Sequence, residues 1–195
     1  MIAALVAGLF ALAAWIYLLA GRGGFWLARE RDDRGPSAPA PAAWPSVVAV
    51  VPARNEADVI ESALSGLLAQ DYPGDFRIIL VDDDSADGTG DLARGMATGD
   101  RLTVISGAPL PAGWTGKVWA QSQGITAAGA ADFLLLTDAD IAHAPDNLRR
   151  LTARAEEGGL VLTSLMAKLA VKTWADRLLI PAFVFSLPCS IPSPG

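Results

Sequence analysis

The sequence predicts an α/β fold with an open, mostly parallel sheet that carries helices on both faces. Short apolar runs rich in β-branched residues alternate along the chain with segments of 3.6-residue period, which is the pattern of repeated βαβ units. Acidic residues directly follow several of these runs, and open parallel sheets bind ligands at the carboxyl ends of their strands. A long apolar segment at the start of the chain predicts that one N-terminal transmembrane helix precedes the sheet.

The composition favours a folded chain and narrows the possible functions. Of the 195 residues, 52% are hydrophobic and only 18% are charged, which is too apolar for a disordered tail. The 15 basic residues are outnumbered by 21 acidic ones, and the net charge of −6 leaves no basic face for nucleic acid. The single cysteine, Cys189, excludes an internal disulfide and a cysteine-cluster zinc site.

The first 20 residues predict a membrane anchor, because Met1 to Ala20 are all hydrophobic apart from Gly8. Twenty residues at about 1.5 Å per residue cover the ~30 Å hydrocarbon core of a bilayer. A cleavable signal peptide is the alternative, but such peptides begin with positive charge and no Lys or Arg precedes Arg22. We expect a single-pass anchor over residues 1–21. The positive-inside rule then places the catalytic domain in the cytoplasm, because four arginines follow the span: Arg22, Arg29, Arg31 and Arg34.

Residues 22–45 are predicted to be a linker, basic at first and then rich in proline and alanine. Its second part, Gly35 to Pro45, contains four prolines among small residues, a composition that stays extended. Residues 46–195 remain, and they suffice for one domain with its own hydrophobic core.

The predicted domain begins with a strand and continues with alternating helices and strands. After the first strand, Asn55 is expected to cap a helix whose apolar stripe contains Ile60, Ala63, Leu64, Leu67 and Leu68. Further helices are predicted from the loop at Lys117 to about Ala128 and over Asn147 to Glu157. Five short apolar runs are predicted as strands: Ser46 to Val51, Phe76 to Val81, Leu102 to Ile105, Asp132 to Thr137 and Leu160 to Thr163.

Three strand ends carry the residues that point to chemistry. The first is followed by Pro52-Ala53-Arg54-Asn55-Glu56, the second by Asp82-Asp83-Asp84, and the fourth by Asp138-Ala139-Asp140. Asp138 and Asp140 flank one residue, so a turn can direct both carboxylates at one Mg²⁺ or Mn²⁺ ion. No glycine-rich phosphate loop follows any strand, which favours a nucleotide held by acids and a metal.

Lys117 lies at the start of its predicted helix, where the helix dipole disfavours a cation. An anion bound at that helix terminus would make Lys117 a phosphate partner. A solvated surface lysine is the alternative.

The segments VVAVVPARNEAD, IILVDDDSADGT, GK before a helix, and FLLLTDADIAHAPDNL together resemble the inverting family 2 glycosyltransferases of GT-A fold. The resemblance implies a nucleoside-diphosphate sugar donor, of UDP type, and a divalent metal, Mn²⁺ or Mg²⁺. It implies that the turn from Pro52 through Ala53 and Arg54 to Glu56 packs around the base and ribose. It further implies that Asp83 reads a uracil-like ring with support from Asp82, that Asp138 lies near the ribose and the metal, and that Asp140 ligates the metal.

A narrower resemblance concerns the apolar N-terminus, the segment GWTGKVWAQSQG and the stretch LLIPAFVF. These are similar to the hopene-associated glycosyltransferases of bacterial hopanoid synthesis. The resemblance implies a membrane-bound enzyme with a lipid acceptor, related to hopanoids.

The acceptor-binding half of such an enzyme is not found in the sequence. The family takes its catalytic base from beyond the Asp-x-Asp motif, and no acid after Asp140 is nominated for that role. The proline-rich ending after Phe185 suggests a truncated or frameshifted product that retains the donor-binding half. A non-catalytic nucleotide-sugar-binding remnant is therefore an alternative. A haloacid-dehalogenase-type phosphatase, with Asp138 as nucleophile, is a further one.

Overall fold

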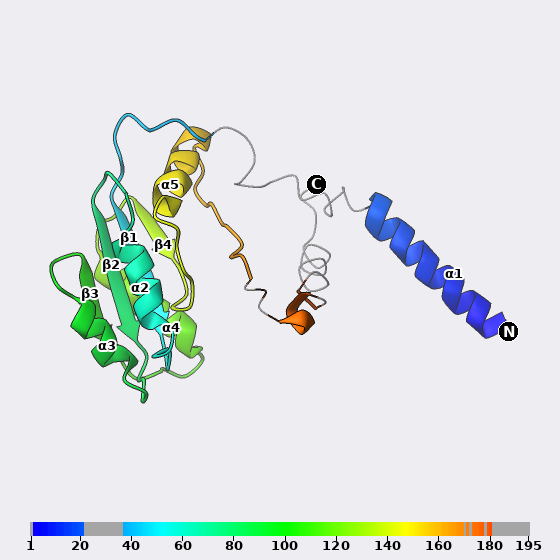
Figure 1. The fold of residues 1–195 in the computed structure, drawn as a ribbon, viewed down its shortest axis with the longest axis horizontal. Coiled ribbons are helices and arrows are strands. Elements are labelled where there is room, and N and C mark those ends of the chain that lie inside the picture. The colour runs from blue at the N-terminus through cyan, green and yellow to red at the C-terminus, as the bar shows by residue number, and fades with distance from the viewer. Residues whose placement is uncertain (1, 22–36, 170, 172, 178, 181–195) are drawn as a thin grey trace. The chain divides into compact units, whose positions relative to one another are not determined.

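The structure, a computed structural model, describes residues 2–21, 37–169, 171, 173–177 and 179–180. The chain divides into two compact units, of which Ser37–Ser164 is the larger. This larger unit contains the sheet, and Figure 1 shows its strands with helices packed around them. Its four strands are β1 (Val47–Ala53), β2 (Phe76–Asp82), β3 (Leu102–Ser106) and β4 (Phe133–Leu136).

The sheet has the order β3-β2-β1-β4, and each neighbouring pair is parallel. All seven residues of β1 are buried, as expected for a central strand covered on both faces. Val47 pairs with Phe76 of β2 and with Phe133 of β4, so the three strands begin at the same level. β2 ends opposite Ala53, whereas β4 ends opposite Val50. The predicted parallel sheet is thereby confirmed.

Alternate residues of β1 enter two separate hydrophobic clusters, one on each face of the sheet. On one face, Val47 and Val51 pack with side chains from α2 (Ile60–Leu68), and Ala93 of α3 (Thr89–Met96) and Leu148 of α5 (Asn147–Gly158) belong to the same cluster. On the other face, Val48 and Val50 pack with Ala120 and Ala128 of α4 (Gly116–Ala128). Helices on both faces, as the sequence predicts, are therefore confirmed.

The close approach of α4 to the sheet depends on small residues. Its buried residues are Ala120, Gly124 and Ala128, which recur at every fourth position and share one helix face. A Cβ atom on Gly124 would collide with Val50 and lie 3.1 Å from Val81 Cγ2. The glycine therefore sets the spacing between α4 and the strands β1 and β2.

Two local predictions are wrong. Leu160 to Thr163 form no strand, and Val161 is 99% exposed. An apolar run becomes a strand only where a neighbouring strand supplies hydrogen bonds, and none pairs with this segment among the described residues. Asn55 does not cap α2, which begins at Ile60 with no side-chain cap. Asn55 instead has a positive φ of 55°, and its Oδ1 accepts a hydrogen bond from the Ala86 N–H.

The N-terminal prediction also needs correction. The sequence predicts one transmembrane helix over residues 1–21, whereas α1 covers Ile2–Ile16 and a π-helical turn, η1, covers Tyr17–Gly21. None of the helices in the described residues is long and apolar enough to cross a membrane.

The predicted linker and C-terminal tail are only partly covered. Residues 37–45 contain neither helix nor strand, in agreement with an extended segment. The basic part of the linker over residues 22–36 lies outside the described residues. The tail from residue 181, on which the truncation hypothesis depends, also lies outside them.

Candidate functional site

The register of the sheet brings the three motif-bearing strand ends together. Ala53 at the end of β1 pairs with Asp82 at the end of β2, and β4 ends on the other side of β1. The residues that follow these strands therefore meet at one edge of the sheet. Arg54 and Asp83 come directly after β1 and β2, and Asp138 is the second residue after β4. The carboxyl edge of a parallel sheet is the usual ligand-binding edge of such folds.

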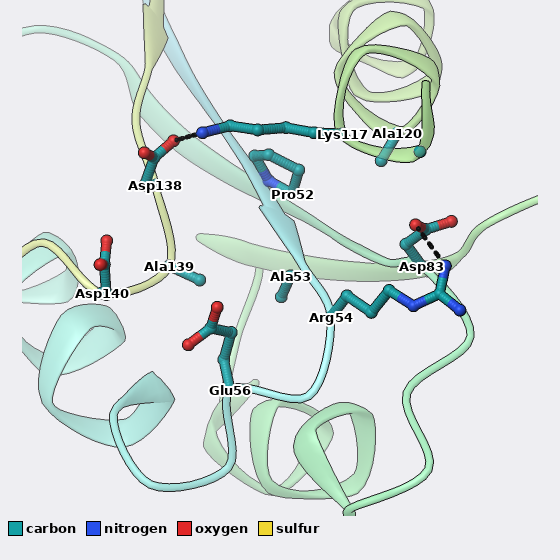
Figure 2. Close-up of a pocket in the computed structure, with 11 residues that line it drawn as sticks. Pro52, Ala53, Arg54, Glu56, Asp83, Lys117, Ala120, Asp138, Ala139 and Asp140 are labelled. Carbon is teal, nitrogen blue, oxygen red and sulfur yellow. Dashed lines mark hydrogen bonds and ion pairs between the residues drawn. The ribbon is translucent and has the colours of Figure 1, made fainter. Parts of the chain in front are cut away.

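A pocket of about 390 Å³ opens at this edge. It contains all the site residues that the sequence nominates except Asp82. Figure 2 shows the Glu56, Asp138 and Asp140 carboxylates on one side of the pocket and the Arg54 and Asp83 pair on the other. The lining residues are Pro52, Ala53, Arg54, Glu56, Asp83, Gly116, Lys117, Ala120, Asp138, Ala139 and Asp140.

Lys117 reaches across the pocket from the first turn of α4 to Asp138 at the end of β4. Its Nζ lies 2.7 Å from Asp138 Oδ1, and both side chains are about half-exposed. Within the described residues Asp140, which is exposed, forms no ion pair. Of the two carboxylates of the Asp-x-Asp turn, Asp138 alone therefore has an ionic partner among the described residues.

Asp83 lies at the opposite side of the pocket, against Arg54 and the start of α4. Arg54 Nη1 donates to Asp83 Oδ2 at 3.3 Å, and the Asp83 side chain is only 12% exposed. A Cβ atom on Gly116 would lie 2.8 Å from the same Asp83 oxygen. Glycine at this position therefore lets the helix start approach the carboxylate closely.

Asp82 faces away from the pocket. Its Oδ1 accepts the Ser85 N–H at 3.2 Å, and its Oδ2 lies 3.9 Å from Arg94 Nη2 of α3. Consecutive residues of a strand point to opposite faces, so Asp82 stabilises the β2–α3 connection while Asp83 enters the pocket. In the structure Asp82 can support Asp83 only through the backbone of that connection.

A network of side chains outside the pocket holds the turn that carries Glu56. Thr89 Oγ1 accepts the Glu56 N–H at 2.8 Å, and Asp87 Oδ2 accepts the Ala57 N–H at 3.0 Å. The Thr89 hydroxyl also donates to Asp87 Oδ1 at 2.6 Å. These hydrogen bonds, that from Thr89 above all, hold the pKa of the Asp87 carboxyl below its usual value. The sequence analysis assigned no role to Asp87 or Thr89, although both lie in the segment IILVDDDSADGT.

His143 supports the residue that precedes the Asp-x-Asp turn and does not line the pocket. Its Nε2 lies 3.0 Å from Thr137 Oγ1, and its Nδ1 lies 3.0 Å from Asn147 Nδ2 at the start of α5. With the Asn147 amide as donor, Nδ1 accepts and Nε2 carries the proton donated to Thr137. Burial lowers the pKa of His143 and favours this neutral form.

The predicted metal ligands are carboxylates, which are the oxygen donors that Mg²⁺ and Mn²⁺ prefer. Among the described residues, no three His, Cys, Asp or Glu side chains gather closely enough to hold a metal by themselves. Asp138 and Asp140 on one turn fit an ion that takes its other ligands from a diphosphate and water. The donor set thus suits a metal that binds together with a nucleotide.

The fold and site define an α/β domain in which opposite charges converge on a pocket at the carboxyl edge of a parallel sheet. The family model described as "Glycosyl transferase family 2" matches residues 48–182. The chain belongs to this glycosyltransferase family. The family match sets aside the phosphatase alternative, and three strands precede the strand that leads to Asp138.

Two similar proteins carry the description N-acetylglucosaminyltransferase. The one from Mesorhizobium japonicum is 31% identical over 141 residues, which cover 70% of this chain and 32% of that protein. The one from Bradyrhizobium elkanii is 32% identical over 138 residues, which cover 68% of this chain and 73% of that protein. The chain thus spans about a third of the length of the first relative and most of the second.

Solved structures agree on the fold. The mannosyltransferase PcManGT from Pyrobaculum calidifontis, in complex with GDP-Man and Mn²⁺, has a TM-score of 0.56 and 26% identity. The match covers 74% of this chain and 43% of that one. Residues 1–349 of TarS from S. aureus, in complex with UDP, have a TM-score of 0.51 and 22% identity, with coverage of 65% and 38%. The GT-A-like α/β fold expected from the sequence is therefore confirmed.

Proposed function

We propose that this chain contains the donor site of a glycosyltransferase and binds a UDP-type nucleoside-diphosphate sugar in the pocket. The observation that carries the proposal is the gathering of Arg54, Lys117, Asp83, Asp138 and Asp140 in one pocket. Its volume of about 390 Å³ lies within the usual range for small-molecule sites. The family membership and the PcManGT complex with GDP-Man and Mn²⁺ support the same ligand class.

The proposed roles follow the two sides of the pocket. Asp83 and Arg54 receive the base and ribose, while Lys117 and the start of α4 receive the diphosphate. Asp138 and Asp140 hold a Mn²⁺ or Mg²⁺ ion, which when bound neutralises the charge that develops on the leaving nucleoside diphosphate. No side chain caps α4, so its first N–H groups are available to an anion.

The proposed reaction transfers the sugar from the diphosphate to an acceptor hydroxyl. The bond between the anomeric carbon and the phosphate oxygen breaks, and a bond from that carbon to the acceptor oxygen forms. The acceptor proton passes to a base that the described residues do not identify. Since the chain covers 32% of one relative, transfer by this chain is a separate question from donor binding.

We further propose that the acceptor is a lipid, related to hopanoids, and that the chain works at a membrane with its donor site on the cytoplasmic side. The sequence resemblance and the apolar surface of α1 support this, since Ile2 and Phe10 are each 78% exposed. A helix that exposes apolar side chains all round favours an apolar environment. Phe10→Glu should reduce co-sedimentation with lipid vesicles. The control Val161→Glu, at a residue that is 99% exposed, should leave it unchanged, and equal co-sedimentation of both variants would argue against attachment through α1.

Thermal unfolding with added nucleotide tests donor binding. UDP with Mn²⁺ should raise the melting temperature, because a ligand at 100 times its Kd stabilises the folded state by about 2.7 kcal/mol. Asp140→Ala should abolish the metal-dependent part of the shift. Asp91→Ala is the matched control, because Asp91 is a carboxylate on α3 that does not line the pocket and whose side chain is 89% exposed. The proposal fails if neither UDP nor GDP shifts the melting temperature with or without Mn²⁺.

A second assay separates the enzyme from a non-catalytic binding protein. Release of UDP from UDP-N-acetylglucosamine in the presence of a lipid extract is measured for the chain that binds UDP. Release that depends on Asp140 supports the transferase. Binding without release favours the nucleotide-sugar-binding remnant.

A further inference from the structure

The Asp-x-Asp turn presents one neutralised carboxylate and one free carboxylate. Asp138 is paired with the ammonium of Lys117 at 2.7 Å. Asp140, two residues further from the strand, is exposed and has no ion pair in the described part of the chain. A divalent cation entering without nucleotide would therefore meet one available carboxylate and one already occupied by a cation.

The position of Lys117 on α4 makes this pairing replaceable. Lys117 is the second residue of the 13-residue helix α4, and the positive end of a helix dipole disfavours a cation. Asp138 supplies the compensating negative charge when the pocket contains no anion. A diphosphate at the same helix start would supply more negative charge, and it would also accept hydrogen bonds from the uncapped N–H groups.

The exposure of the pair indicates that the exchange needs no rearrangement of the core. The Lys117 side chain is 58% exposed and the Asp138 side chain is 47% exposed. Figure 2 shows the long Lys117 side chain extending past Pro52 to Asp138. Rotation about its side-chain bonds can move the ammonium within the pocket while α4 stays packed on the sheet through Ala120.

We propose that Lys117 is the resident counter-ion of Asp138 and that donor binding transfers its ammonium from this carboxylate to the diphosphate. Lys117 then opposes metal binding when nucleotide is absent and supports binding when nucleotide is present. The pair thereby couples occupation of the metal position to the arrival of the nucleotide. This inference rests on the proposed function, because the exchange requires a diphosphate in the pocket.

The exchange predicts opposite effects of one substitution on two affinities. Lys117→Met removes the charge and retains the length of the side chain. The affinity for Mn²⁺ alone, measured from the electron paramagnetic resonance signal of the free ion, should rise roughly 2- to 5-fold, the range that loss of a half-exposed ion pair allows. The affinity for UDP at saturating Mn²⁺, measured by calorimetry, should fall about 10-fold, as for loss of a charge-assisted hydrogen bond.

Matched variants of the full chain control for charge and for folding. Arg154→Met removes one positive charge from an exposed position of α5 and should leave both affinities within about twofold of the wild type, since an exposed charge outside the pocket is screened by salt. Lys117→Gln should reproduce the two opposite changes, because it also removes the positive charge. Far-UV circular dichroism verifies that each variant is folded.

The results separate this inference from the proposed function. If the wild type binds UDP with Mn²⁺, but Lys117→Met leaves the affinity for Mn²⁺ alone unchanged or lowers it, the exchange is refuted and the donor site stands. If the wild type binds neither UDP nor GDP, the proposed function fails. The exchange then fails as well, because it requires a diphosphate in the pocket. Opposite changes in the two affinities, absent from Arg154→Met, establish the exchange.

Discussion

The small residues on the buried face of α4 predict a measurable cost of adding one methyl group. In Gly124→Ala the new Cβ would collide with Val50 and lie 3.1 Å from Val81 Cγ2, and both valines are completely buried. A β-branched side chain in a central strand has little rotamer freedom with which to yield. Overpacking costs about 1–3 kcal/mol, whereas alanine in place of glycine inside a helix gains about 1 kcal/mol. Because the Val50 contact is far inside van der Waals distance, we take the upper part of the range and expect a net loss of about 1–2 kcal/mol.

Thermal unfolding followed by circular dichroism provides the assay. A loss of about 1–2 kcal/mol should lower the melting temperature by roughly 4–8 °C in a domain of this size. Gly95→Ala in α3 is the control, because nothing lies within 4 Å of its added Cβ. It retains only the gain in helix propensity and should raise the melting temperature by roughly 4 °C. If Gly124→Ala raises the melting temperature as Gly95→Ala does, α4 does not pack on the sheet through Gly124.

Three further predictions concern the residues around the pocket. In Gly116→Ala the new Cβ would lie 2.8 Å from Asp83 Oδ2 and would displace that carboxylate. The affinity for UDP, measured by calorimetric titration, should fall about 10-fold with little change in melting temperature. Unchanged affinity would contradict a role for Asp83 in binding. Asp87→Ala should lower the melting temperature and speed hydrogen exchange at the Ala57 amide, because Asp87 accepts a hydrogen bond from that N–H. Asp87→Asn keeps an acceptor oxygen and should retain part of the protection. Unaltered exchange in Asp87→Ala would contradict the network. In the folded state, burial lowers the pKa of His143 below its ordinary value of 6.5, so the unfolded chain binds the proton more readily. The contribution of neutral His143 to the free energy of unfolding is therefore complete above about pH 6.5 and is lost as the pH falls below it. His143→Gln should lose less stability over this acidic range than the wild type, and identical pH profiles of the melting temperature for the two proteins would show that His143 does not contribute.

The strands that the sequence predicts correctly have apolar runs that are visible locally. β1 and β2 are buried on both faces, so their side chains are apolar at nearly every position. Leu160 to Thr163 have the same composition but remain unpaired in the structure. Strand formation depends on a partner that is distant in the sequence, and an apolar run contains no information about whether such a partner is in place.

The two neighbouring acids at the end of β2 show a similar limit at the site. The resemblance assigns Asp82 and Asp83 to one nucleotide site, whereas the structure directs Asp82 toward Arg94 and Asp83 toward Arg54. The alternation of side chains along a strand already requires that the two acids point to opposite faces. Which face contains the pocket follows from the position of α4, which is a tertiary contact.

Periodicity and motifs are properties of neighbouring residues, so the α/β class, the family and the residue types at the three strand ends can be predicted without a structure. The contacts of these residues cannot: Lys117 pairs with Asp138, Asp140 has no ion pair among the described residues, and His143 contacts Thr137 directly before the Asp-x-Asp turn. These relations join α4 to β4 and the Asp-x-Asp turn to α5. They depend on the strand order β3-β2-β1-β4. The packing of helices on the two faces of the sheet sets this order, and no pattern among neighbouring residues specifies it.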